Sequence, residues 1–202
     1  AFRWAELLCW LLRRLKKSYC LTLHGGRLPE FAEQYPRRFR RLIQSAAIVT
    51  TPSNFLNRTF EHLRGDIRTI PNGVSIHRYD YFDCGSPKPN LMWMHALSEI
   101  YNPQLAIKAF ANLVDAYPDA TLTIMGPDTG DGTFAAVKNL AEAHGLQDKI
   151  KFTGAIPKKN IGQCLQQGSI FLNTTHYESF GIAVMEAAAC GLCIVTTNVG
   201  EM

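Results

Sequence analysis

The stretch SIFLNTTHYESFGIAVMEAAACGLCIVTTN, residues 169–198, predicts a strand, a helix and a second strand in succession. Residues 169–175 and 192–198 are short runs of apolar and β-branched side chains, which is typical of strands. Residues 180–191 between them are long enough for a helix and end at Gly191, where a helix commonly stops. Because a helical crossover joins neighbouring parallel strands, the stretch predicts an α/β fold.

The same alternation extends back along the chain to Leu91. Strands are predicted at 91–97, 121–126 and 149–156, and helices at 102–118, 133–145 and 158–168. In the first of these helices apolar residues recur every three or four positions, and prolines mark both of its ends. Five strands that alternate with four helices predict a parallel sheet with helices on both of its faces.

The first part of the chain has the same character but fewer strands. Helices are predicted at 2–17, 36–45 and 53–63, and strands at 19–26, 46–52 and within 67–74. The segment CGSPKPN, residues 84–90, is rich in Gly, Pro and Ser, which is typical of a linker. We therefore expect a first domain over 1–84, a linker over 85–90 and a second domain over 91–202.

The charge of the chain is unevenly distributed. Residues 1–68 hold 13 Lys and Arg against 5 Asp and Glu, whereas the remaining residues hold 8 against 12. A basic first half favours an anionic membrane surface or a phosphorylated substrate, or is a solvated positive face. The apolar run within 2–17 is too short to span a bilayer. We expect this segment to pack on a sheet or to touch a membrane through Trp4, Trp10 and its basic residues.

The chain has six cysteines whose spacing does not repeat, so a disulfide framework is not expected and a reducing compartment is favoured. Cys190 and Cys193 form a C-x-x-C pair at the predicted end of a helix, where we interpret them as core residues rather than as a redox pair. The chain has no second such pair with which to complete a zinc site.

Two carboxylates, Glu178 and Glu186, flank the start of the last predicted helix. At about 100° per residue, eight positions turn by about 800°, so both carboxylates can face one cleft, with Glu186 about two turns into the helix. The N–H groups of the helix start form a seat for phosphate, Ser179 can cap it, and Gly181 allows close approach. A nucleotide sugar suits this layout. The alternative is that Glu178 is a capping carboxylate and Glu186 is buried and paired.

Two other predicted strands also end in segments that suit a ligand. The segment TIMGPDTGDGT, residues 123–133, is rich in Gly and Asp but lacks the Gly-Lys-Ser/Thr of a P-loop. The segment LTLHGG, residues 21–26, places His24 at a strand end before two glycines. A lone histidine is commonly structural, and its position at a strand end makes it a candidate for the site.

The segment ESFGIAVMEAAACGLCIVTTNVGE resembles the signature of retaining glycosyltransferases of the GT-B fold, family 4, which is Glu-x7-Glu, a small-residue helix, Gly and an apolar strand. IRTIPNGV, AFANLVDAYPDATLTIMGP and KFTGAIPKKNIGQCLQQGSIFLNTT are similar to further segments of that family, in the same order. The resemblance covers nearly the whole chain from about residue 18. It implies two Rossmann-like domains with parallel sheets, both truncated at the chain ends, so the chain is expected to be an internal fragment.

The resemblance also implies roles for single residues. The N-terminal domain would hold the acceptor and the C-terminal domain a nucleotide-diphosphate sugar. Glu178 and His24 would lie at the reaction centre, and Glu186 would bind the ribose hydroxyls. The other implied donor-binding residues are Ser179, Phe180, Gly181, Ile182, Ala183, His95 and Gly126, and those on the acceptor side are Gly25, Gly26 and Ser53. The family transfers with retention, generally without a metal, and no cofactor is expected.

The chain departs from the family pattern in one place. Arg and Lys usually follow the first strand of the C-terminal domain, where they neutralise the diphosphate, but neither occurs between Leu91 and Ile107. His95 or Ala96 stands at the Arg position and Tyr101 at the Lys position. Losing both cations costs several kcal/mol of transition-state stabilisation if nothing replaces them. A non-catalytic nucleotide-sugar-binding or partner protein is therefore the alternative function.

The expected reaction is hexose transfer to a glycan or a lipid-linked acceptor in cell-envelope or exopolysaccharide synthesis. The expected location is the cytoplasm, with peripheral contact at the inner face of the membrane through the basic N-terminal domain. No nucleic-acid partner is expected.

Overall fold

The computed structural model describes residues 2–83, 85 and 88–202. The chain forms two compact units. The first consists of Ala1–Gly73, Tyr177–Phe180 and Gly200–Met202, and the second of Val74–His176 and Gly181–Val199. Cys84 and residues 86–87 of the expected linker lie outside the described residues.

The second unit begins earlier than the domain boundary expected at residue 84. Tyr79 is 7% exposed and belongs to a buried cluster of this unit. The Phe82 N–H donates to the carbonyl of Cys190 at 3.1 Å, and the Gln166 amide donates to the carbonyl of Asp80 at 2.7 Å. Residues 74–83, which composition assigned to the first domain, therefore pack with the second unit.

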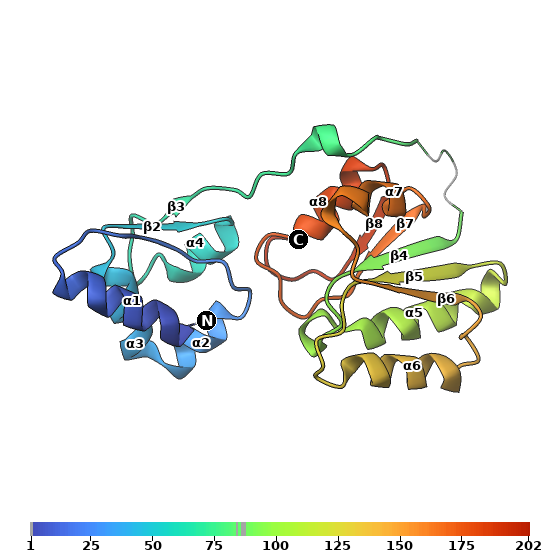
Figure 1. Cartoon of the computed structure of the whole chain (residues 1–202), viewed down its shortest axis with the longest axis horizontal. Coiled ribbons are helices and arrows are strands. Elements are labelled where there is room, and N and C mark those ends of the chain that lie inside the picture. Colours follow the sequence, from blue (N-terminus) through green and yellow to red (C-terminus); the bar gives the residue numbers. More distant parts are fainter. Residues whose placement is uncertain (1, 84, 86–87) are drawn as a thin grey trace. The chain divides into compact units, whose positions relative to one another are not determined.

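The second unit is built on a five-stranded parallel sheet in the order β6-β5-β4-β7-β8. Its strands are β4 (Asn90–Met94), β5 (Thr121–Met125), β6 (Ile150–Gly154), β7 (Ile170–Asn173) and β8 (Cys193–Thr196). Helices α5 (Pro103–Ala116) and α6 (Thr133–Ala143) cover one face, and α7 (Ile161–Leu165) and α8 (Ile182–Ala189) cover the other (Figure 1). The predicted parallel sheet with helices on both faces is confirmed.

Three short 3-10 helices complete the second unit: η1 (Ile76–Arg78), η2 (Glu99–Tyr101) and η3 (Lys158–Asn160). The helix predicted over 158–168 is divided between η3 and the short α7. Its Gly162 is buried, and a Cβ there would lie 3.3 Å from the Arg78 carbonyl oxygen, so this turn packs closely on the chain that precedes the sheet.

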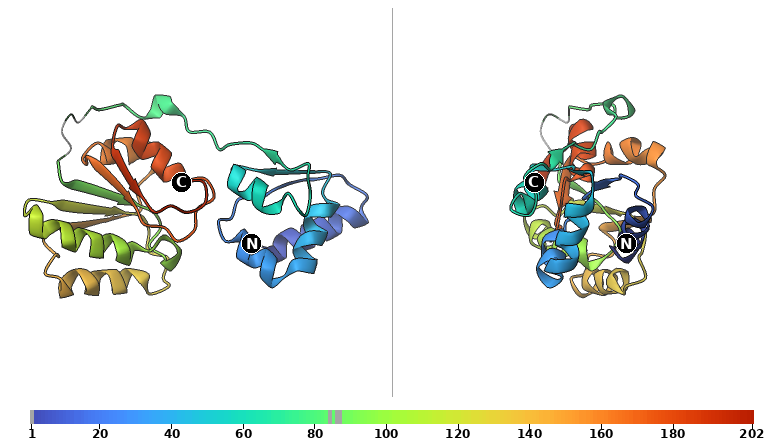
Figure 2. Two further views of the ribbon diagram at one scale, coloured as in Figure 1. Left: turned by 180° about the vertical axis from the view of Figure 1, so that it is seen from behind. Right: turned by 90° about the vertical axis from the view of Figure 1, so that its left-hand side faces the viewer.

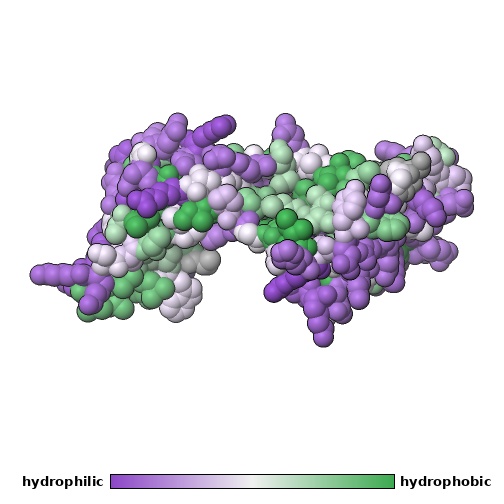
Figure 3. All heavy atoms as spheres, turned by 90° about the horizontal axis from the view of Figure 1, so that it is seen from above, coloured by the Kyte–Doolittle hydropathy of each residue, from purple (hydrophilic) through white to green (hydrophobic). Residues whose placement is uncertain are grey.

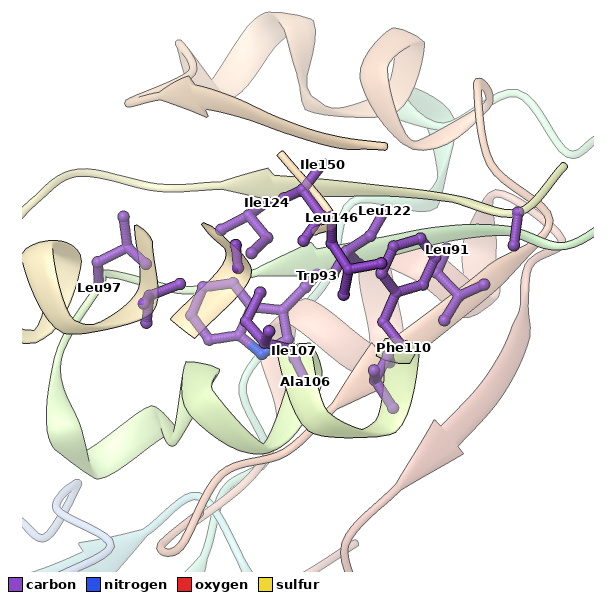
Figure 4. Packing of buried hydrophobic residues seen from close by; sticks show 14 residues of the cluster. Leu91, Trp93, Leu97, Ala106, Ile107, Phe110, Leu122, Ile124, Leu146 and Ile150 are labelled. Carbon is purple, nitrogen blue, oxygen red and sulfur yellow. The ribbon is translucent and has the colours of Figure 1, made fainter. Parts of the chain in front are cut away.

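The larger core of the second unit lies between the sheet and α5 and α6. Trp93 from β4 lies beside Ile107 of α5, and Phe110 packs one turn further along the helix (Figure 4). All three side chains are fully buried, which stabilises the fold by about 2–3 kcal/mol each. The indole N–H of Trp93 donates to the Thr174 hydroxyl at 2.9 Å, so the end of β7 is fixed to the core.

The first unit holds a three-stranded parallel sheet in the order β1-β2-β3. Its strands are β1 (Cys20–Thr22), β2 (Ile48–Thr51) and β3 (Arg68–Thr69), and its helices are α1 (Phe2–Arg14), α2 (Leu28–Gln34), α3 (Pro36–Ser45) and α4 (Asn54–Phe60). Helices α1, α2 and α3 lie next to one another (Figure 2). Helix α2 was not predicted, because seven residues are too few to show a helical period.

The core of the first unit is formed by side chains of α3, β2 and α4, among them Phe39, Val49 and Phe60. Helix α1 presents an apolar stripe to solvent, in which Trp4 is 69% and Leu8 55% exposed. On the face drawn in Figure 3, such apolar patches interrupt a largely hydrophilic surface. In the described part of the chain, no helix has the length and apolar character needed to cross a membrane.

Candidate functional site

The site of the second unit lies where the strand order of its sheet reverses. Strand β4 has β5 on one side and β7 on the other, although β5 follows β4 in sequence and β7 comes much later. In open parallel sheets, ligands bind beyond the carboxyl ends of the strands at such a point. His95 comes directly after β4, and Asn173 is the last residue of β7. Both residues therefore lie at the switch point.

His95 and Asn173 are joined by a hydrogen bond of 2.8 Å between Nε2 and Oδ1. The Asn173 side-chain nitrogen donates to the Thr196 hydroxyl at 3.0 Å, and that hydroxyl donates to the Thr197 carbonyl. This chain of donors fixes the orientation of the Asn173 amide, so its oxygen faces the imidazole. Nε2 of His95 therefore carries the hydrogen.

The His95 ring stacks on Tyr101, with ring centroids 4.4 Å apart and ring planes 11° apart. The turn that carries Tyr101 is held by the end of β7. The Thr174 hydroxyl lies 3.1 Å from the Tyr101 carbonyl, and the Thr175 hydroxyl donates to the Ile100 carbonyl at 3.2 Å. His95 and Tyr101 thus form a stacked aromatic pair just beyond β4.

Gly126 ends β5 beside His95. Its φ is +145°, and a Cβ there would lie 1.8 Å from the His95 carbonyl oxygen, so no other residue can occupy the position without moving the backbone. The following loop is closed by Asp131, which accepts the Thr133 N–H at 3.0 Å. Hydrogen bonds from the side chain and backbone of Thr133 lower the Asp131 pKa to about 2. The loop is therefore well organised at neutral pH.

Glu186 is a buried carboxylate on α8, with 3% of its surface exposed. The Tyr79 hydroxyl donates to its Oε1 at 2.7 Å, and Lys158 pairs with the same oxygen. Within residues 2–83, 85 and 88–202, no group donates a hydrogen bond to its Oε2. The burial and pairing of Glu186 that the alternative interpretation expects are therefore observed, and a role in donor binding stays a prediction. One of its oxygens remains available to accept hydrogen bonds from a ligand.

The Tyr79 hydroxyl is held in its protonated form. Burial, together with its hydrogen bond to Glu186, raises the pKa of Tyr79 to about 12. Burial, with the charge of Glu186, also raises the pKa of the Cys190 thiol. A thiol with a raised pKa is a poor nucleophile, which agrees with Cys190 as a core residue.

Helix α8 begins at Ile182, two residues later than expected, because Gly181 takes the left-handed conformation with φ +77°. Glu186 therefore lies about one turn into the helix, not two. Among the described residues, no side chain caps α8. The backbone N–H groups at Ile182 and Ala183 belong to the unsatisfied first turn, which is where an anionic group is stabilised.

The prediction that Ser179 caps α8 is wrong. Ser179 belongs to the first unit, where its hydroxyl donates to the His24 carbonyl at 2.8 Å. Glu178 accepts the N–H groups of Ser179 and Phe180 on one oxygen, at 2.8 and 3.1 Å. Glu178 thus acts as a local capping carboxylate, as the alternative interpretation from the sequence expects. A Cβ on Gly26 would lie 3.1 Å from the Glu178 nitrogen, so these backbones pack tightly within the unit.

Ser53 has a structural role in the first unit. It is 1% exposed, and its hydroxyl accepts the Leu56 N–H at 3.2 Å as the cap of α4. Gly25 follows His24 beyond β1, and a Cβ there would meet Leu28 at 3.3 Å. His24 itself is exposed. These contacts do not test an acceptor role for any of the three.

The structure therefore gathers the predicted residues in two groups. His95, Gly126 and the helix that carries Gly181, Ile182, Ala183 and Glu186 belong to the second unit. His24, Gly25, Gly26, Ser53, Glu178, Ser179 and Phe180 belong to the first. Within the described residues, no group of three His, Cys, Asp or Glu side chains is placed to hold a metal ion. That the reaction needs no metal stays a prediction.

Sequence reasoning missed three residues of the site. The sequence could have identified Lys158, because it begins a Lys-Lys pair just beyond the predicted strand 149–156. Asn173 had a weaker signal, as a polar residue in an apolar strand. Tyr79 had none, because its contact with Glu186 joins positions 107 residues apart in the sequence.

Residues 85–202 match the family described as Glycosyl transferases group 1. The chain is 35% identical over 97 residues to a phosphatidylinositol N-acetylglucosaminyltransferase component of Arabidopsis thaliana, a match of 48% of the chain and 21% of that protein. It is 27% identical over 222 residues to D-inositol 3-phosphate glycosyltransferase of Arthrobacter sp. (strain FB24), a match of 98% of the chain and 50% of that protein. The chain thus spans about half the length, or less, of these curated relatives.

Solved structures share the fold. The Anabaena protein Alr3699/HepE in complex with UDP and glucose matches with a TM-score of 0.81 and 18% identity, over 98% of this chain and 57% of that one. Sucrose-phosphate synthase from Thermosynechococcus elongatus matches with a TM-score of 0.80 and 17% identity, over 96% of this chain and 55% of that one.

Proposed function

The chain belongs to the Glycosyl transferases group 1 family and has the α/β fold of GT-B enzymes, and on that premise we propose that it transfers a hexose from a nucleotide-diphosphate sugar to an acceptor with retention of configuration. The second unit binds the donor and the first unit binds the acceptor. In family terms we assign it to the retaining family 4 enzymes, which its Glu178-x7-Glu186 signature supports.

The observation that carries this proposal is the environment of Glu186. Its carboxylate is buried, is held on Oε1 by Tyr79 and Lys158, and receives no hydrogen bond on Oε2 from the described residues. No buried side-chain oxygen of the described residues lacks a hydrogen-bond partner, so Oε2 is reached by solvent and is open to a ligand. It can accept hydrogen bonds from the two hydroxyls of a ribose. Glu186 therefore binds the ribose of the donor.

The position of the ribose indicates which protein groups bind the rest of the nucleotide sugar. The N–H groups of the first turn of α8 meet the diphosphate, and Gly181 allows it to approach the backbone. Stabilising the departing diphosphate lowers the barrier, because charge develops there as the bond to the sugar breaks. His95 lies at the switch point, with a hydrogen on Nε2. That hydrogen is donated to Asn173, so His95 serves as a cation toward the diphosphate only when its other ring nitrogen is protonated as well. Glu178 and His24 serve the transfer centre.

The test of the proposed function is turnover by the full-length protein with Glu178→Gln and with Glu186→Gln. Each substitution keeps the shape of the side chain and removes its charge. We expect transfer and donor hydrolysis to fall by about 100-fold or more, in line with the loss of a charged group that stabilises a transition state. Glu142→Gln, an exposed position on α6, is the matched control and keeps full activity. Unchanged turnover in both site variants would sink the assignment.

We further propose a glycan or lipid-linked acceptor, a role in cell-envelope or exopolysaccharide synthesis, and a cytoplasmic location at the inner face of the membrane. The first unit supports membrane contact because α1 exposes Trp4, Leu8 and Leu11 beside basic residues. The name of the Arabidopsis relative includes phosphatidylinositol, which supports a lipid-linked acceptor. Flotation of the protein with anionic vesicles tests this contact.

One observation favours a second function. No Arg or Lys lies between Leu91 and Ile107, where the resemblance implies two cations, and His95 and Tyr101 stack on each other in this segment. A protein that binds a nucleotide sugar without transferring it needs less charge stabilisation at the leaving group. Calorimetry with UDP and GDP sugars separates the functions. Binding without turnover favours the second, and absence of binding removes both.

A further inference from the structure

Helix α3 carries four arginines and no acidic residue in the sequence PRRFRRLIQS. Arg38 is paired with Glu6. Arg37, Arg40 and Arg41 are exposed and form no ion pair with a carboxylate among residues 2–83, 85 and 88–202. Their spacing of three and four residues places them on one side of the helix.

These three arginines oppose the stability of α3. Like charges at such spacing destabilise a helix by about 0.2–0.5 kcal/mol per pair. Arg37 and Arg38 also lie in the first turn, where the helix dipole favours negative charge. Folding alone does not explain this arrangement, because an acidic residue in the first turn would stabilise the helix. A bound anion relieves both effects.

A pocket of about 450 Å³ opens beside the arginines, within the first unit. Arg37 and Arg40 come from α3, and His62 and the half-buried Leu63 follow α4. The buried ring of Phe60 contributes to the floor, together with Pro29 and Ala32 from α2. The pocket thus has an apolar floor and a basic rim, and its volume is that of a small-molecule site.

The ionisable side chains that line this pocket are Glu33, Arg37, Arg40 and His62. Glu33 of α2 lines it with one negative charge, against the two positive charges of Arg37 and Arg40, and His62 adds a third when protonated. A second hollow of about 380 Å³ is lined by Arg37, Arg40 and Arg41. The net charge of the two hollows is therefore positive at neutral pH.

We propose that this α3 pocket binds the phosphate group of an amphiphilic phosphate ester. Arg37 and Arg40 contact the phosphate, and the apolar part of the ligand lies against the half-buried Pro29, Ala32 and Leu63. Arginine suits this ligand because its planar guanidinium donates two hydrogen bonds to one phosphate. The shared chemistry is a phosphate with an apolar substituent, whether it is a soluble ester or the headgroup of a membrane lipid.

The experiment uses the full-length protein and dihexanoyl phosphatidic acid below its micelle concentration, measured by calorimetry. We expect binding that weakens at least tenfold in the double variant Arg37→Gln, Arg40→Gln. Arg58→Gln, an exposed arginine on α4 outside the pocket, is the matched control and binds as the wild type does. The melting temperature of each variant shows that the fold is intact.

Three results would overturn the proposal. One is no binding of the short-chain ester. Another is equal affinity for inorganic phosphate and for the ester, because the apolar floor then contributes nothing. The third is binding that the double variant leaves unchanged. Vesicles of phosphatidylcholine with phosphatidic acid distinguish the sources: binding to both probes that depends on the arginines assigns a lipid headgroup, and binding to the soluble ester alone assigns a soluble ligand.

Discussion

Glu186 and Asn173 in the second unit differ from the arginines of α3 in the first unit in how the fold holds their side chains. In the second unit, Glu186 on α8 and Asn173 at the end of β7 are buried, and each is held by neighbouring side chains. On α3 of the first unit, Arg37, Arg40 and Arg41 are exposed and are not paired with a described carboxylate. The buried groups are fixed by the fold, whereas no described carboxylate holds the three exposed arginines.

This difference has energetic consequences. Breaking a buried polar contact destabilises the protein, because the partner left behind stays out of water without a hydrogen bond. Changing an exposed arginine alters the free energy of unfolding by less than about 0.5 kcal/mol. Substitutions of the buried polar groups in the second unit should therefore affect stability and ligand binding together, and those of the exposed arginines on α3 should affect binding alone.

The largest effect is expected for Gly126→Ala. The new methyl group would overlap the His95 carbonyl, and alanine is also strained at a φ of +145°. We expect the free energy of unfolding to fall by about 3 kcal/mol or more, with loss of donor binding. Gly130→Ala is the control: it has a φ of +74° with open space around it, and should cost about 1–2 kcal/mol. If urea unfolding shows the same loss of stability for Gly126→Ala and Gly130→Ala, the close approach of Gly126 to the His95 carbonyl is contradicted.

The next effect is expected for Tyr79→Phe, which removes the hydroxyl and keeps the ring. A hydrogen bond to a charged group contributes about 1.5–3 kcal/mol, so stability should fall by that order, and Glu186 should hold the donor less firmly. Tyr19→Phe removes the hydroxyl of a half-buried tyrosine, which bonds Ser45 in the first unit, and should leave donor affinity unchanged. Unaltered donor affinity in Tyr79→Phe would show that the tyrosine does not position Glu186.

The same tyrosine predicts a dependence on pH. Its pKa is about 12 in the folded protein and about 10 when unfolded, so folding favours the protonated form. The stability that this provides is fully present below pH 10 and is lost as the pH rises from 10 to 12, at about 1.4 kcal/mol per unit. Tyr79→Phe lacks this loss, so the stability difference between the two proteins should shrink over that range. A constant difference in unfolding free energy would contradict the shift.

A smaller effect is expected for Ser53→Ala. The substitution removes the cap of α4 and should lower the free energy of unfolding by about 1 kcal/mol. Because the hydroxyl is buried and bonded to the helix, we expect the acceptor KM to stay within about twofold of the wild type when stability is intact. Ser53→Thr, which keeps the hydroxyl, is the control. A large rise in the acceptor KM for alanine but not for threonine would contradict a purely structural role of Ser53 and support its role on the acceptor side.

Much of this fold was predictable because its signals are local. Pro36 opens α3 and Pro103 opens α5, so both helices begin close to where the sequence places them. The run of small residues after β7 likewise predicted helix α8, because that pattern is also local in the sequence. The remaining features depend on contacts between distant segments. Helix α2 is too short to show a period, and it is held by the packing of Phe31 on Phe2 and Phe39.

The site shows the same division between local and distant information. The burial of Glu186 could be inferred from the apolar helix around it. Its partner Tyr79 could not, because that contact depends on how residues 74–83 pack against the second unit. Helix α8 begins later than predicted because Gly181 adopts a left-handed conformation. Ser179 does not cap the helix as predicted, because its hydroxyl donates to the His24 carbonyl.

The most direct test of the donor site is a crystal structure of the full-length protein with UDP or GDP bound. We predict that the ribose hydroxyls donate to Oε2 of Glu186 while Tyr79 keeps its bond to Oε1, and that the diphosphate meets the N–H groups of the first turn of α8. A nucleotide bound elsewhere, with Glu186 still held only by Tyr79 and Lys158, would contradict the assignment.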